Sequence, residues 1–240
     1  MGRVILIALL LWPSLVWAGA WPRGKGAVYI DLSFYAYPQD HDTRGLTPHI
    51  YLEYGISERL TFALDGLFRN EHDMFTGIAS VTTAIATKSK KLKFAYGFGY
   101  GLMPYQYQTI DELYDLINGN RILVAEETLT HTKRQSVTQF SAHAGLGLKK
   151  GWISADAYIQ IFQSENIPLY KLDMTYGRNF SPKLTGHIQM QYGARGDASY
   201  LNLAPTVDWK LTPKTSLTLG ANYDVMSGYH GLKLGTILQF

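Results

Sequence analysis

The sequence predicts an all-β protein, namely a transmembrane up-and-down antiparallel β-barrel of twelve strands. Three observations predict it. Apolar and polar residues alternate along almost the whole chain after residue 20, as they do in strands with two unlike faces. Charged residues keep almost entirely to one phase of that alternation. Several alternating segments also run for about ten to thirteen residues, long enough for a tilted strand to cross a bilayer.

The first twenty residues have the layout of a secretory signal peptide. An apolar run from Val4 to Trp17 ends in the small residues Ala18 to Ala20, which form an A-x-A cleavage pattern. The alternative is a membrane anchor, but Pro13 breaks the run, which is also shorter than the roughly 20 residues of a spanning helix. We expect export, with residues 1–20 as the signal peptide and 21–240 as one barrel domain.

Composition excludes several classes of protein. The 240 residues include no cysteine, which excludes a disulfide scaffold, a cysteine-ligated metal and a cysteine nucleophile. The formal net charge is only +3, and the basic residues form no cluster, so we expect no nucleic-acid partner.

The alternating segments predict where the strands lie. They are found at about 27–37, 48–56, 60–69, 74–87, 92–103, 135–148, 152–163, 168–180, 184–194, 199–211, 215–226 and 231–240. Tight turns alternate with longer connections, and two turns read Ser181-Pro182-Lys183 and Thr212-Pro213-Lys214. Proline after Ser or Thr favours a type I turn because it presets φ.

The distribution of charge and aromatic residues favours a membrane barrel. Twelve strand charges lie opposite the apolar phase: Asp31, Glu53, Asp65, Arg69, Lys93, Asp156, Lys171, Asp173, Asp208, Lys210, Asp224 and Lys233. Only Arg178, beside a turn, breaks the rule. A soluble up-and-down barrel would alternate too. However, aromatic residues on the apolar phase gather near both strand ends, as in interfacial girdles, and strands facing lipid must close into a barrel.

These features together resemble Gram-negative outer-membrane β-barrel proteins. The resemblance covers 21–240 and implies an outer-membrane location, contact with membrane lipid and lipopolysaccharide, and short turns in the periplasm. It also implies that the barrel-assembly machinery reads the terminal strand, which ends in Phe240. The segments Gly55–Thr61 and Ala20–Gly26 are similar, in addition, to putative outer-membrane channel proteins associated with the phenol meta-cleavage pathway.

The longest connection, 104–134, contains a helix signal. Thr109 to Glu112 form a capping box and Gly119 follows Asn118, which predicts a short helix over 110–118. Such a helix is marginal alone, so it would restrict the barrel mouth or pack on neighbouring loops. The tight turns are basic and the long loops acidic. This asymmetry has two interpretations: the charges keep the turns soluble, or the acidic loops at the outer rim attract cationic solutes.

Inward-facing polar residues are the candidate functional groups. We expect Arg69, Lys93, Asp156, Lys171, Asp173 and His187 to line the lumen and affect the selectivity of a passive channel or binding pore for small solutes. The same charges would also suit a salt-bridged plug in a closed structural or surface-interaction barrel. The alternative activity is a hydrolase at the outer rim, with carboxylates and imidazoles from His41, Asp42, His72 and Asp73. No cofactor and no metal is expected.

Overall fold

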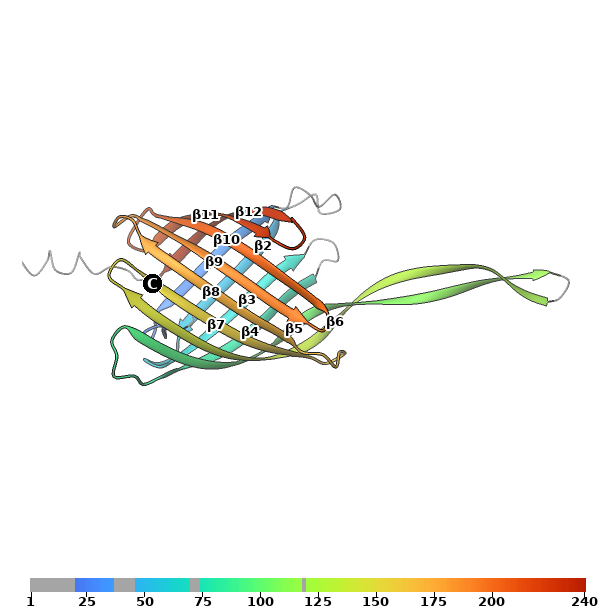
Figure 1. Cartoon of the computed structure of the whole chain (residues 1–240), viewed down its shortest axis with the longest axis horizontal. Helices are drawn as coiled ribbons and strands as arrows, with labels where there is room; N and C mark the ends of the chain where they lie inside the picture. Colours follow the sequence, from blue (N-terminus) through green and yellow to red (C-terminus); the bar gives the residue numbers. More distant parts are fainter. Residues whose placement is uncertain (1–19, 37–45, 70–73, 118–119) are drawn as a thin grey trace, which may run out of the picture.

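The computed structural model describes the backbone of residues 20–36, 46–69, 74–117 and 120–240, with side chains except at 69, 74 and 104–132. The strands are β1 (Val28–Ala36), β2 (Thr47–Gly55), β3 (Leu60–Arg69), β4 (Met74–Ile85), β5 (Leu92–Ile117), β6 (Asn120–Leu148), β7 (Gly151–Phe162), β8 (Leu169–Asn179), β9 (Leu184–Arg195), β10 (Ala198–Lys210), β11 (Thr215–Asp224) and β12 (His230–Gln239). Each pairs antiparallel with its sequence neighbours (Figure 1). Within these ranges no helix is long and apolar enough to cross a membrane.

The barrel closes where its two terminal strands meet. Ile30 lies opposite Leu238 and Phe34 opposite Leu234 across β1 and β12. Reciprocal backbone hydrogen bonds join Val28 and Phe240, at 3.1 Å and 3.0 Å. Closure leaves no unpaired sheet edge along the wall, and the predicted twelve-stranded up-and-down barrel is therefore confirmed.

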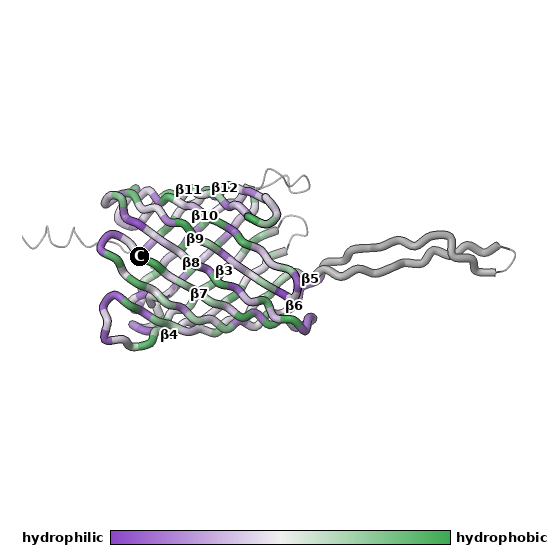
Figure 2. The backbone as a smooth tube through the Cα atoms, viewed as in Figure 1, coloured by the Kyte–Doolittle hydropathy of each residue, from purple (hydrophilic) through white to green (hydrophobic). Residues whose placement is uncertain are grey.

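Burial in this barrel is the reverse of that in a water-soluble protein. Large apolar side chains cover the outer face and are exposed, with Leu219 at 63% and Leu234 at 61%. Inward side chains such as Ser154, Thr218 and Asp208 are buried, at 1%, 1% and 5% exposure. Apolar and polar residues alternate along each strand of the wall (Figure 2). An apolar outer face around a polar interior is the arrangement of a barrel whose solvent is lipid.

The tight turns gather at the end of the barrel where the chain terminates (Figure 1); we call it the turn end. Hydroxyl side chains hold these turns: Ser57 and Ser181 accept hydrogen bonds from the backbone N–H groups of Leu60 and Leu184, at 3.1 Å and 3.0 Å. The basic residues of the turns are all exposed: Arg59, Lys88, Lys90, Lys91, Lys149, Lys150, Lys183 and Lys214.

The longest connection differs from the prediction. β5 and β6 run for 26 and 29 residues and form a long hairpin that projects from the end opposite the turn end (Figure 1). The helix predicted over 110–118 is wrong, because β5 continues as a strand to Ile117, opposite Asn120. Pairing satisfies the backbone groups that face the partner strand along the hairpin, whereas a helix of that length is marginal on its own.

The outer half of this hairpin contributes no pairing to the wall. β4 pairs with β5 only as far as Leu102, and β7 pairs with β6 only from Val137.

We predict that replacing residues 108–130 with a two-residue turn leaves a barrel with wild-type thermal stability. Heat-modifiable mobility on gels and the melting temperature measure this. A deletion variant that no longer folds would show that the hairpin supports the barrel.

Candidate functional site: the barrel lumen

The wall formed by β6, β7 and β8 carries a buried polar chain. His143 Nδ1 lies 2.7 Å from Asp156 Oδ1, and His143 Nε2 lies 2.9 Å from Ser141 Oγ. A carboxylate only accepts hydrogen bonds, so Nδ1 carries the proton, and in the neutral imidazole Nε2 accepts from the serine. Asp173 lies directly opposite Asp156 in the register, where two like charges repel. The imidazole therefore partners one of the two carboxylates.

This serine–histidine–aspartate chain has the order of a hydrolase triad but not its surroundings. Ser141 lies within β6, which pairs here with Gly97 of β5 and Tyr158 of β7. The backbone N–H groups beside the hydroxyl are thus used by the sheet, while acyl transfer needs free donors for the oxyanion. The chain of hydrogen bonds instead solvates Asp156 inside the wall.

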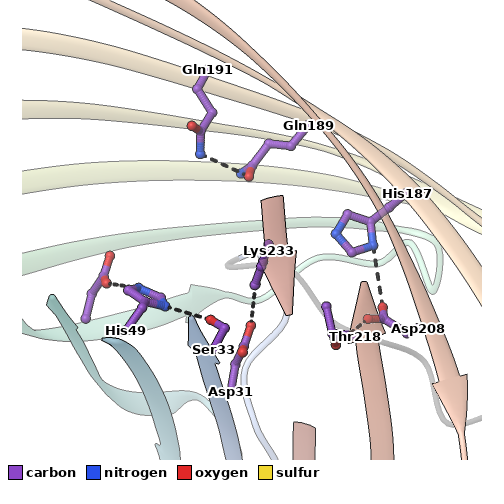
Figure 3. A network of polar contacts seen from close by, with 10 residues as sticks. Asp31, Ser33, His49, His187, Gln189, Gln191, Asp208, Thr218 and Lys233 are labelled. Carbon is purple, nitrogen blue, oxygen red and sulfur yellow. Dashed lines mark hydrogen bonds and ion pairs between the residues drawn. The ribbon is translucent and has the colours of Figure 1, made fainter. Parts of the chain in front are cut away.

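A second polar network joins the strands at the closing seam (Figure 3). Lys233 Nζ on β12 donates to Asp31 Oδ2 on β1 at 2.7 Å. Across β9 to β11, Thr218 Oγ1 donates to Asp208 Oδ1 at 2.7 Å, and His187 Nδ1 lies 3.5 Å from Asp208 Oδ2. The basic groups of these strands thus stand beside buried carboxylates.

A third network follows β1, β2 and β3 (Figure 3). His49 Nε2 lies 2.8 Å from Asp65 Oδ1, and its Nδ1 lies 3.4 Å from Ser33 Oγ. The ring of Tyr35 packs edge-on against this imidazole. The side chain of Asp65 is 63% exposed, so this carboxylate faces open space although it lies on the inward phase.

Tyrosines and carboxylates meet across the middle of the lumen. Tyr51 on β2 donates a hydrogen bond of 2.7 Å to Glu53, and its phenol is within electrostatic range of Tyr158 on β7. Tyr158 in turn senses the carboxylates of both walls, including Glu53 and Asp173. β2 and β7 are not neighbours in the barrel, so this electrostatic interaction runs across the lumen.

Some carboxylate oxygens in the lumen have no hydrogen-bond partner among the described residues. They are Asp31 Oδ1, Asp173 Oδ1 and Asp208 Oδ2. All three residues are at most 7% exposed. A buried acceptor without a donor is costly, so an ordered water that donates to one of these three oxygens would be favourable.

The structure brings most of the predicted lumen residues onto the inner face. Asp156 and Asp173 are adjacent, Lys171 lies with its Nζ 5.4 Å from the ring centre of Tyr158, and His187 is on a separate wall beside Asp208. Lys93 lies on β5 opposite the inward Gly145.

Other predicted residues cannot be placed in the same way. Arg69 ends β3, and its side chain is not described. His41, Asp42, His72 and Asp73, the alternative rim site, lie outside the described residues. Among the residues that are described, no group of three or more side chains could hold a metal ion.

Two functional candidates were not predicted from the sequence. Trp21 and Arg23 precede β1, and both are held inside the barrel at the turn end, where Arg23 pairs with Glu53 and Trp21 packs with Trp152. Two signals were available. These large side chains stand between the predicted cleavage site and the first predicted strand, and they lie in Ala20–Gly26, which is similar to channel proteins.

Comparisons with known proteins show the fold. No protein-family profile matches the chain, and no curated protein matches it. Among solved structures it is similar to the KdgM porin, with a TM-score of 0.60, 7% identity, and coverage of 88% of this chain and 99% of that one. A complex of KdgM porin with disordered oligogalacturonate gives a TM-score of 0.61 at the same identity and coverage. At this identity the likeness establishes a shared barrel fold.

Proposed function

We propose that the chain is an outer-membrane barrel that passively conducts small solutes. The observation that carries this proposal is the reversed burial, with an apolar face outside and ionisable groups inside. An apolar exterior of this kind is stable only in lipid. Some of these ionisable groups pair with one another, as Lys233 does with Asp31, and the others are available to solvate what passes through the lumen.

The lumen groups support a pathway for polar solutes with hydrogen-bond donors. Asp173 Oδ1 has no hydrogen-bond partner among the described residues, and Asp173 lies opposite Asp156 in the register. Lys171 lies opposite Tyr158, with its Nζ 5.4 Å from the ring centre. Charged side chains that line a pore set its ion selectivity, and Lys171 and Asp173 place one charge of each sign close together on β8. We propose that Asp156, Lys93, His187 and Arg69 also affect this selectivity.

Conductance in planar bilayers tests the proposal. Asp173→Asn is expected to shift the reversal potential in a salt gradient toward anion selectivity, and Lys171→Gln to shift it toward cation selectivity. The two variants control for each other, because they change the charge of the same part of β8 with opposite sign. Wild-type protein that inserts without conducting ions, or shifts of the same sign in both variants, would rule out this pathway.

The solute class and the assembly route are finer proposals. The similarity of Gly55–Thr61 and Ala20–Gly26 to channels associated with phenol meta-cleavage, together with tyrosines in the lumen, supports monoaromatic solutes. Phenol should then interrupt the current where glucose does not.

We also propose export through residues 1–20, contact with lipopolysaccharide, and recognition by the barrel-assembly machinery of the last strand, whose Phe240 side chain is 61% exposed.

A further inference from the structure

The segment before the first strand does not leave the barrel. Residues 20–26 turn into the lumen at the turn end and touch opposite parts of its wall. The segment starts from β1, where Gly26 N donates to Gly55 O at 2.7 Å and Gly55 N donates to Ala27 O at 2.9 Å. Gly26 adopts a φ of 78°, which favours glycine and lets the chain reverse direction there.

Arg23 fixes the middle of this segment to the wall formed by β1, β2 and β3. Its backbone N–H donates to Thr61 Oγ1 at 2.9 Å, and its guanidinium forms an ion pair with Glu53 and lies 4.3 Å from the ring centre of Tyr29. Glu53 is 5% exposed. A buried carboxylate needs a partner, and Arg23 supplies it from outside the strands.

Trp21 lies against the other side of the lumen. Its ring covers Gly145 of β6 so closely that a Cβ atom added there would lie 2.4 Å from the indole. The same ring packs with Trp152 of β7, and Trp21 is 7% exposed. Gly145 therefore forms the seat for the indole, since any side chain at this position would occupy the same space.

The strand order shows that the segment bridges the lumen. β4 and β5 separate β3 from β6 along one side of the barrel, and β8 to β12 separate β7 from β1 along the other. Contacts to β1–β3 and to β6–β7 therefore require the segment to cross the interior. The turn of β2 and β3 and the segment 20–26 are also the two stretches similar to putative channel proteins, and here they are hydrogen-bonded to each other.

We propose that residues 21–26 form a resident strap that sets the width of the passage at the turn end, with Trp21 as its movable end and Arg23 as its anchor. This inference rests on the proposed channel function. Cleavage after Ala20 leaves Trp21 as the first residue of the mature chain, two residues before the anchor at Arg23. The indole can then leave its seat on Gly145 without breaking any strand pairing, and the passage widens when it does.

A matched pair of glycine substitutions on β6 tests the strap without changing any residue of the strap itself. Gly145→Val fills the seat of the indole and expels it. Gly147→Val adds the same volume to the same inward face of β6, but a Cβ there would lie 3.7 Å from its nearest neighbour, which is an ordinary contact. Trp21→Ala removes the indole directly. Folding of each variant is checked by heat-modifiable mobility.

Two measurements are made on the refolded mature chain. In planar bilayers, Gly145→Val and Trp21→Ala are expected to raise the single-channel conductance about twofold or more, while Gly147→Val stays at the wild-type value. In hydrogen exchange with mass spectrometry, the peptide that contains residues 21–27 is expected to exchange about tenfold faster in Gly145→Val than in wild type or Gly147→Val.

The outcomes separate the strap from the channel. Conducting wild-type protein with an unchanged conductance in Gly145→Val and Trp21→Ala overturns the strap and leaves the channel standing. Equal rises in Gly145→Val and Gly147→Val also overturn it, because the effect then belongs to the wall. If no variant conducts, the channel itself fails, and the strap as a determinant of the passage fails with it.

Discussion

Replacing Leu219 with arginine is expected to destabilise the barrel by about 2–4 kcal/mol, the cost of a basic side chain at the bilayer midplane. Leu219 lies in the middle of β11, between Val207 and Leu234 on its neighbours, and is 63% exposed. An exposed leucine of a water-soluble protein would accept arginine within about 0.5 kcal/mol. The free energy of unfolding, measured by urea titration in phospholipid vesicles, gives the result.

The control is the same substitution at the turn end. Leu211 is 52% exposed in the connection between β10 and β11, where a long basic side chain reaches water. Leu211→Arg should cost only about 0–1 kcal/mol. Equal effects at the two positions would mean that depth along the barrel is irrelevant, and the exposed apolar face would then not be embedded in lipid.

Replacing Lys233 with methionine is expected to cost about 3–5 kcal/mol, because it leaves a buried carboxylate without its partner. Lys233 Nζ donates to Asp31 Oδ2 at 2.7 Å across the closing seam, and the side chains are 16% and 11% exposed. Asp31 Oδ1 already lacks a partner among the described residues. Loss of the Lys233 ammonium would leave the Asp31 carboxylate buried without a positively charged partner.

A double-mutant cycle of Lys233→Met, Asp31→Leu and the double variant distinguishes loss of the pair from loss of packing. Lys233→Met with Asp31→Leu should be more stable than Lys233→Met alone, because the stranded charge is gone. Lys183→Met, in an exposed tight turn, should stay within about 0.5 kcal/mol of wild type. If the double variant is no more stable than Lys233→Met alone, the Asp31 carboxylate is already hydrated and its pairing with Lys233 does not stabilise the barrel.

The strands could be predicted because alternation is a local property. Successive residues of a strand point to opposite faces, so a short stretch of sequence is enough to locate a strand. β7 was expected at 152–163 and is found at Gly151–Phe162. The terminal strand was expected at 231–240 and is found at His230–Gln239. The requirement that strands in lipid leave no edge then gave the closed barrel without any knowledge of the register.

The helix was wrongly predicted because a local signal competes with long-range pairing in that segment. A capping box at Thr109 to Glu112 favours the start of a helix, whereas the strand ladder depends on residues that follow much later. Gln108 pairs with Thr130, and the residues near Gln108 in the sequence do not predict that partner. Long-range pairing prevailed over the local preference, as it often does in β-proteins.

The contacts of the candidate site were beyond prediction for a related reason. Alternation shows which residues face inward but not which of them stand side by side. Lys233 and Asp31 are 202 residues apart and become partners only through closure. Trp21 and Arg23 carry no periodicity, so their place in the lumen follows from a glycine seat on β6 and a buried acid on β2.

The hairpin of β5 and β6 gives the chain two units of unequal cooperativity. Its outer half pairs only with itself, from about Met103 to Ile117 on β5, a reach of about 50 Å at 3.3 Å per residue. A lone two-stranded ribbon is marginally stable in water, so its amides open at low free energy while those of the cylinder open only on global unfolding. Sequence in the ribbon can therefore diverge, be cut or accept insertions without a thermodynamic cost to the cylinder.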